Sequence, residues 1–144
     1  MTAITSVTTE HASSVTRLIE AFVNGDPAAA GALVTDDVVG WSPALHVTSR
    51  EDLLAAFEDR EGAFTDVEVT VDKVDVIRDR AIAEWRAAAN FTGDLTLSGA
   101  TVPPTGERIY LAGATFSEFN GQRICSFRHY FDDAAILEQL LGLS

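Results

Sequence analysis

Four side chains that can move protons or stabilise oxyanions occur within five positions near the end of the chain. They are the guanidinium of Arg128, the imidazole of His129, the phenol of Tyr130 and the carboxylate of Asp132. A carboxylate can take a proton from a substrate while a phenol or a guanidinium stabilises the negative charge that develops on an oxygen. This stretch therefore predicts acid/base chemistry that needs neither a metal ion nor an organic cofactor.

The predicted strand that carries these residues decides which of them can act together. Side chains alternate between the two faces of a strand, so Arg128, Tyr130 and Asp132 share one face and His129 lies on the other. We therefore assign the predicted catalytic roles to Asp132, Tyr130 and Arg128. Each keeps a structural alternative: Asp132 can cap the helix that follows, Tyr130 can pack with its hydroxyl in water, and Arg128 can be a solvated side chain.

The histidines and the single cysteine do not extend this set. His11, His46 and His129 lack the paired spacing that metal ligands need, so no metal site is expected. His11 falls in the first turn of a predicted helix and is expected to be exposed. His46 follows a strand broken by proline, and we expect it either at the mouth of a pocket or on a surface loop. Cys125 lies within a strand pattern, which predicts a buried thiol.

Composition restricts the chain to one globular domain spanning residues 1–144. Hydrophobic residues make up 47% of the 144 residues, enough to bury a core, and the formal net charge is -12. This negative charge argues against nucleic acid and anionic membranes as partners. The N-terminus lacks the basic start and apolar run of a signal peptide, and no apolar stretch approaches the ~20 residues of a membrane span, so a cytoplasmic protein is expected.

Helices are predicted in the first half of the chain. Residues 1–8 are expected to be loose, and Thr8 or Thr9 to cap a helix whose apolar residues recur with helical spacing. Asp26 caps a second helix of small residues, and Ser49 caps a third. The predicted helices end near Asn24, Val34 and Arg60.

In the second half of the chain the apolar residues recur with a period of two, which predicts strands. A change of parity at Asp72-Lys73 predicts a bulge, and Asn120-Gly121 predicts a hairpin turn. Residues 93–107, rich in glycine and proline, predict a loop. The predicted strands cover residues 37–43, 67–77, 81–92, 108–119 and 122–131.

This order of elements, closed by a helix over 133–141, predicts an α+β domain. The N-terminal helices should pack on one side of a strongly curved, mainly antiparallel sheet. Such a sheet can curl into a cone whose open end takes a hydrophobic small molecule. The wall of this pocket is assigned to Trp41, Trp85, His46, Phe57 and Asn90.

Segments along nearly the whole chain resemble the SnoaL-like polyketide cyclases of the NTF2-like superfamily. The most specific is Tyr130-Phe131-Asp132 followed by Gln139-Leu140, which is similar to the ending of these cyclases. The resemblance implies a cone-shaped fold and a homodimer. It also implies that Asp132 is the general acid/base of an intramolecular aldol ring closure without a cofactor. The other matching segments are 25–26, 36–38, 103–106, 111–113 and 120–124.

The chain also departs from its relatives. Phe91 stands where many of these cyclases have a histidine. Ser42 and Leu18 stand where a ketosteroid isomerase would have its aspartate and tyrosine, and Arg86 lacks the acidic partner found in limonene-epoxide hydrolases. Two hypotheses follow: a SnoaL-like acid/base enzyme acting on a hydrophobic carbonyl-bearing molecule, and a non-catalytic protein that binds a small ligand in the same cone. A third treats the outer face of the sheet as a dimer interface and nothing more.

Overall fold

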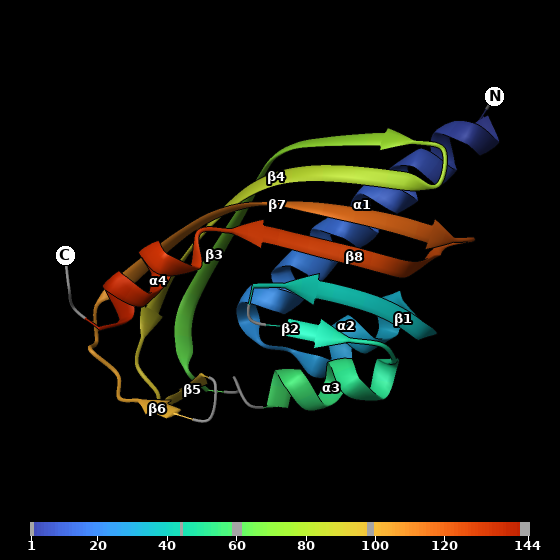
Figure 1. Ribbon diagram of the computed structural model, residues 1–144. Coiled ribbons are helices and arrows are strands. Elements are labelled where there is room, and N and C mark those ends of the chain that lie inside the picture. The colour runs from blue at the N-terminus through green and yellow to red at the C-terminus, as the bar shows by residue number, and fades with distance from the viewer. Residues whose placement is uncertain (1, 44, 59–61, 98–99, 142–144) are drawn as a thin grey trace.

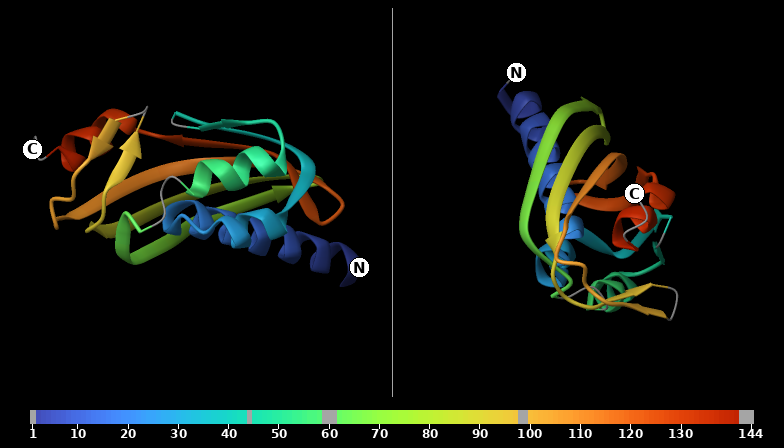
Figure 2. Two further views of the ribbon diagram at one scale, coloured as in Figure 1. Left: turned by 90° about the horizontal axis from the view of Figure 1, so that it is seen from below. Right: turned by 90° about the vertical axis from the view of Figure 1, so that its left-hand side faces the viewer.

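The computed structural model describes residues 2–43, 45–58, 62–97 and 100–141. It has the predicted α+β architecture, in which a curved six-stranded sheet carries three helices on one face and a fourth helix at one end (Figure 1, Figure 2). The helices are α1 (Thr2–Asn24), α2 (Pro27–Leu33), α3 (Arg50–Glu58) and α4 (Asp133–Leu140). The strands are β1 (Val34–Ser42), β2 (Leu45–Val47), β3 (Phe64–Ile77), β4 (Arg80–Phe91), β5 (Leu95–Leu97), β6 (Ala100–Val102), β7 (Arg108–Asn120) and β8 (Arg123–Phe131).

The strand order β2-β1-β8-β7-β4-β3 places β8 inside the sheet. It pairs in parallel with β1 and antiparallel with β7, and the other neighbouring pairs are antiparallel. The predicted hairpin between β7 and β8 is confirmed, and Gly121 begins its turn with φ 65°, a left-handed conformation that glycine adopts without strain. We call the face of the sheet that packs on α1 to α3 the inner face, and the opposite one the outer face.

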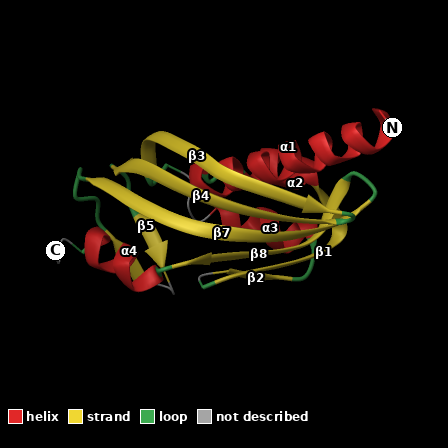
Figure 3. Cartoon of the chain, turned by 90° about the horizontal axis from the view of Figure 1, so that it is seen from above, coloured by secondary structure: helices red, strands yellow, loops and turns green. Residues whose placement is uncertain are grey.

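Helix α1 packs its predicted apolar stripe against this inner face. Val15, Leu18 and Ile19 are fully buried, and the helix lies along β3 and β4 (Figure 3). The helix begins at Thr2, so residues 2–8 are helical and not loose as expected, while Met1 lies outside the described residues. None of the described helices is long and apolar enough to cross a membrane.

His11 is buried rather than exposed, because the early start of α1 places it in an internal turn. Its ring stacks on Phe119, with ring centroids 3.8 Å apart. Its Nε2 lies 2.9 Å from the carbonyl oxygen of Gly121. This histidine therefore attaches α1 to the hairpin between β7 and β8.

The bulge predicted in the strand over 67–77 is confirmed. Val71 pairs with Trp85 and Lys73 pairs with Glu84, which leaves Asp72 as the extra residue of β3. Its carboxylate accepts two hydrogen bonds from Arg86, at 2.8 and 2.9 Å. The bulge thus gains a bidentate ion pair on the outer face.

The segment over 93–107 is more ordered than a loop. It contains the hairpin of β5 and β6, with Leu95 paired to Val102. Leu95 packs in a second, smaller hydrophobic cluster with Phe91, Ile109 and Leu140. The hairpin and α4 therefore close one end of the domain together, opposite the N-terminus (Figure 1).

The first strand begins earlier than predicted, and the end of the third helix cannot be compared with its prediction. Strand β1 begins at Val34, directly after α2, rather than at Asp37. Helix α3 has the predicted cap, since Ser49 Oγ accepts the backbone N–H of Asp52 at 3.1 Å. Its described part ends at Glu58, and the predicted end at Arg60 lies outside the described residues.

Candidate active site

A bulge in β8 decides which residues of the functional stretch face the interior. Phe119 pairs with Ile124 and Glu118 pairs with Ser126, so Cys125 is an extra residue. Ile124 and Phe127 are therefore both buried although they lie three positions apart. Because a bulge shifts the alternation of side chains by one, odd-numbered residues point inward after it.

Two of the three predicted catalytic residues accordingly point outward. Arg128 and Tyr130 share one face of β8, as predicted, but that face is the outer one and both side chains are exposed. The Tyr130 ring packs against Trp41, 5.2 Å away between centroids, and edge-on against Phe116 at 5.6 Å. The expectation that this face of the strand lines a pocket is therefore not met.

Asp132 is the N-cap residue that precedes helix α4, and it is exposed. Its Oδ1 accepts the backbone N–H of Ala135 at 3.1 Å, which satisfies one of the free amide groups at the start of the helix. This is the capping role named above as the structural alternative. The carboxylate stands at the rim of the sheet, two residues beyond Tyr130.

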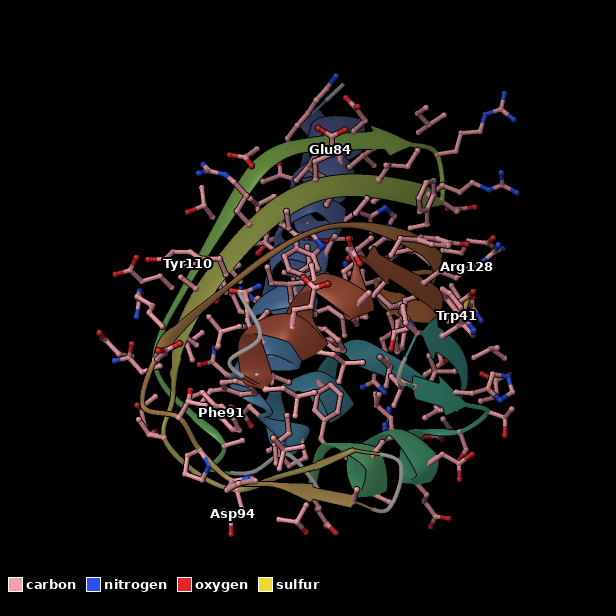
Figure 4. The ribbon with its side chains drawn as sticks, turned by 60° about the vertical axis from the view of Figure 1, so that its left-hand side comes forward. Trp41, Glu84, Phe91, Asp94, Tyr110 and Arg128 are labelled. Atoms are coloured by element: carbon pink, nitrogen blue, oxygen red, sulfur yellow. The ribbon has the colours of Figure 1, made fainter. Side chains whose placement is uncertain are left out.

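The predicted pocket wall divides between the two faces of the sheet. Trp85 and Phe57 are buried, at 1% exposure each, on the inner side. Trp41 lies beside Arg128 on the outer face, where Figure 4 shows the two side chains together, and His46 pairs with Trp41 across β1 and β2. Asn90 also lies on the outer face, where its Oδ1 accepts a hydrogen bond from Arg108 at 3.0 Å.

A buried polar cluster lies on the inner face, where β4, β7 and β8 run side by side. Thr115 Oγ1 lies 2.9 Å from the indole Nε1 of Trp85 and 2.7 Å from Nδ1 of His129. Thr115 and His129 have 0% exposure. The structure thus brings predicted Trp85 together with His129, which the alternation rule had set aside, and with Thr115, which was not predicted.

Aromatic rings surround the imidazole of His129. The ring centroids of Phe22 and Phe127 lie 4.3 and 5.0 Å from that of His129. Phe57 and Phe131 extend this group through Phe22, at 6.3 and 5.8 Å. Because the surroundings are apolar, hydrogen bonds made here are stronger than the same bonds in water.

A signal for this cluster is present in the sequence. The inward positions of β7 are apolar or glycine at 109, 111, 113 and 119, with hydroxyl side chains between them at Thr115 and Ser117. Hydroxyl groups on an otherwise apolar strand face need buried partners. Thr115 finds its partners in Trp85 and His129.

Cysteine and metal chemistry gain no support at this site. Burial raises the pKa of the Cys125 thiol, and the negative charge of Glu118 adds to the effect, so the thiol stays protonated. Among the described residues, no three histidine, cysteine or acidic side chains are grouped as the ligands of a metal ion would be.

Comparison with known proteins agrees with the resemblance seen in the sequence. The family model of the SnoaL-like domain matches residues 15–127. No curated protein matches the chain significantly. The architecture is the NTF2-like fold.

Solved structures show the same fold at low sequence identity. A candidate SnoaL-like polyketide cyclase from Jannaschia sp. CCS1 has a TM-score of 0.78 and 19% identity, over 94% of each chain. An LEH-like epoxide hydrolase from M. tuberculosis has a TM-score of 0.62 and 20% identity, over 94% of this chain and 92% of that one. A protein with a ketosteroid isomerase-like fold from Catenulispora acidiphila, in complex with trimethylamine, has a TM-score of 0.69 and 22% identity, over 91% of this chain and 93% of that one.

Proposed function

Because the chain belongs to the SnoaL-like domain family, we propose that it is an enzyme that carries out acid/base chemistry on a hydrophobic, carbonyl-bearing small molecule. The molecule binds on the inner side of the sheet, and the reaction uses no metal or organic cofactor. The observation that carries this proposal is the imidazole of His129, which is buried among aromatic rings and hydrogen-bonded to Thr115. His129 interacts with the oxygen of the substrate carbonyl.

The apolar setting of His129 suits this role. A carbonyl substrate becomes acidic at the neighbouring carbon when a donor stabilises the negative charge that develops on its oxygen. A donor held rigidly in an apolar, water-poor site stabilises this charge far more than water does. The rings of Phe22 and Phe127 provide such surroundings.

The base remains a prediction from the family resemblance, with Asp132 as the candidate. Its carboxylate caps α4 through the N–H of Ala135, so proton abstraction requires it to turn away from this cap. Asp132→Asn is the informative variant, because asparagine caps a helix as well as aspartate does but cannot take up a proton at neutral pH. Arg128 and Tyr130 point to the outer face of the sheet, so a substrate on the inner side does not contact them, and they are not part of the proposed site.

Proton exchange at the carbon next to a carbonyl tests the proposal without knowledge of the natural substrate. Acetophenone is incubated with the protein in heavy water, and the loss of its methyl proton signal is followed by NMR. We expect exchange above the buffer rate, reduced about a hundredfold or more in His129→Gln, since one acid/base group contributes 10²–10⁴ in rate. Tyr130→Phe serves as the matched control from the outer face of the same strand.

The outcomes of this experiment distinguish the roles of His129, Asp132 and Tyr130. Normal exchange in His129→Gln, with the variant folded by circular dichroism, would refute the role of His129. Loss of exchange in Asp132→Asn would support Asp132 as the base, whereas unchanged exchange would leave it as a helix cap. A drop in Tyr130→Phe would support the set predicted from strand alternation.

A non-catalytic binding protein is the second candidate. One observation favours it. The carboxylate of Asp132, the predicted general acid/base, is exposed and caps helix α4. This function predicts that acetophenone binds without acceleration of exchange. Mass spectrometry of small molecules that co-purify with the protein would then identify the ligand class.

We also propose a homodimer that forms through the outer face of the sheet. The rings of Trp41, Tyr130 and Phe116 form a connected group there, with 38%, 42% and 44% of their surface exposed. Exposed aromatic groups of this kind mark protein interfaces. Gel filtration with light scattering should give a dimer that Phe116→Glu converts to a monomer, and a monomeric wild-type protein would refute the proposal.

A further inference from the structure

Helix α4 is attached to the sheet through the side-chain amide of Gln139. Its Oε1 accepts the backbone N–H of Tyr110 at 2.8 Å, and its Nε2 donates to the carbonyl oxygen of the same residue at 2.9 Å. These are the two hydrogen bonds that a residue of a neighbouring antiparallel strand would make. Strand β8 does not reach this position, because its last pair with β7 joins Phe131 to Gly113. The amide of Gln139 thus takes the place of a strand at the open edge of β7.

The remaining attachment of α4 is small. It is made to the end cluster, the smaller hydrophobic cluster that contains Phe91, Leu95, Ile109 and Leu140. Leu140 is 1% exposed and Ile136 packs against this cluster, whereas Leu137 and Leu141 are 40% and 54% exposed. A helix of eight residues is not stable by itself in water. The helix therefore depends on the end cluster and on Gln139, and it can leave the sheet as one unit.

A row of aromatic rings connects the start of α4 with the proposed site. Phe131 precedes Asp132, the residue that joins β8 to α4, and its ring packs on Phe22 with centroids 5.8 Å apart. Phe22 packs in turn on His129, at 4.3 Å. The side chain of His129 has 0% exposure. A ligand therefore reaches this ring only when an element of the structure moves.

We propose that α4 is a lid that opens about Asp132 while the sheet stays folded, and that Gln139 holds this lid closed. Opening uncovers the end cluster and the inner face beside it, and this is the route by which a hydrophobic ligand reaches the interior. The route rests on the proposed function. The lid itself rests only on the contacts of α4.

Two neighbouring amides of β7 report on the lid and on the sheet separately. The N–H of Tyr110 is bonded to α4 through Gln139. The N–H of Leu111 points the opposite way, towards β4, where Leu111 pairs with Ala87. Opening of α4 alone frees the first amide and leaves the second one bonded. Exchange of these amides with heavy water, followed by NMR, therefore distinguishes opening of the lid from unfolding of the sheet.

We expect the amide of Tyr110 to be protected at least tenfold less than that of Leu111 in the wild-type protein. Gln139→Met keeps the length of the side chain and the preference for helix but removes both hydrogen bonds. It should lower the protection of the Leu140 amide about tenfold and leave that of Leu111 unchanged. Glu138→Met, at the exposed position beside it, is the matched control and should change neither. Equal protection of Tyr110 and Leu111 would overturn the proposal, as would an unchanged Leu140 in Gln139→Met.

The binding kinetics of a neutral apolar dye test the route. N-phenyl-1-naphthylamine becomes more fluorescent in apolar surroundings, and its binding and release are followed by stopped-flow fluorescence. Competition with acetophenone restricts the signal to the site that the two molecules share. Because a lid limits entry and exit alike, Gln139→Met should raise both rate constants about tenfold and leave the dissociation constant nearly unchanged. Glu138→Met should have the rate constants of the wild type.

The two experiments locate a failure. The expected exchange pattern with unchanged dye kinetics in Gln139→Met would refute the route, while the lid and the proposed function would stand. Equal protection of Tyr110 and Leu111, together with dye binding that acetophenone reverses, would refute the lid and leave the proposed function intact. If neither the dye nor acetophenone bound to the wild-type protein, the proposed function would be refuted, and amide exchange would still decide whether α4 opens.

Discussion

The two faces of strand β8 carry candidate functional side chains that differ in burial and in hydrogen bonding. On the inner face, His129 is fully buried and bonded to Thr115, which is itself bonded to Trp85. On the outer face, Tyr130 and Trp41 are in contact but remain partly exposed. Hydrogen bonds fix the geometry of the inner group. The outer group is held by ring packing, and its rings remain partly exposed to solvent.

This difference separates two kinds of function. A site that acts on a reacting atom needs side chains held in place before the ligand arrives, and the inner group meets this condition. An exposed group of aromatic rings suits the burial of surface against another protein. The same strand thus carries the proposed site on one face and the proposed dimer interface on the other.

The largest expected effect contrasts the two tryptophans. Trp85→Ala should lower the free energy of unfolding by ~3–5 kcal/mol, because it removes a buried ring and leaves a cavity. Trp41→Ala should lower it by less than ~1 kcal/mol, because Trp41 is partly exposed on the outer face. Urea unfolding followed by circular dichroism measures both. Equal losses in the two variants would remove the distinction between the faces.

Gly40 offers a test of close packing on the inner face. It is paired with Phe127 across β1 and β8, and a Cβ placed on it would lie 2.2 Å from Cζ of the Phe127 ring. Gly40→Ala should therefore lower the free energy of unfolding by ~1–3 kcal/mol, as overpacking does in other cores. Val39→Ala, on the exposed side of the same strand, is the control. A stabilised Gly40→Ala would show that the ring moves freely.

Asp132, at the rim of the sheet between the two faces, allows a test of how much its helix cap contributes to stability. Asp132→Ala should cost about 1 kcal/mol of stability through loss of the cap on α4, while Asp132→Asn should cost only a few tenths. Thermal unfolding of the two variants measures this difference. If Asp132→Asn destabilises as much as Asp132→Ala, the negative charge contributes beyond the hydrogen bond to Ala135.

The smallest effect concerns the ion pair of the bulge in β3. The hydrogen bonds from Arg86 lower the pKa of Asp72 in the folded state. A lowered pKa stabilises the folded protein above the ordinary aspartate value of about 4, and this contribution is lost as the pH falls through the lowered pKa. Asp72→Asn should therefore be less stable than the wild type near neutral pH and equally stable in strong acid. A difference that persists in acid would assign the effect to packing.

Much of the fold could be predicted because local patterns agree with the final packing. The helical spacing of Val15, Leu18 and Ile19, and the alternation around Trp85, place the same residues in the core as the structure does. The bulge at Asp72 was visible because valines on either side of it change parity. Residues 93–107 were predicted as a loop because their glycine and proline residues are typical of loops. The segment nevertheless contains the short β5–β6 hairpin.

The candidate site was harder to predict because it depends on the bulge in β8, which no sequence pattern indicates. Cys125 and Ser126 are small and fit either face of a strand, so nothing marks the shift between Ile124 and Phe127. Both faces of β8 also carry aromatic residues, so hydrophobicity alone does not identify the inner one. The contact between Trp85 and Thr115 joins positions 30 residues apart, which local patterns cannot anticipate.

The extra residue in β8 has an evolutionary consequence. Deletion of the single codon for Cys125 would remove the bulge and leave Ile124, Phe127 and His129 on the inner face in regular alternation. If the strand instead kept Cys125 and lost the bulge, Arg128 and Tyr130 would replace His129 on the inner face. A lineage with this fold can therefore change the chemistry of its interior through the register of one strand, without substitution of any residue after the bulge.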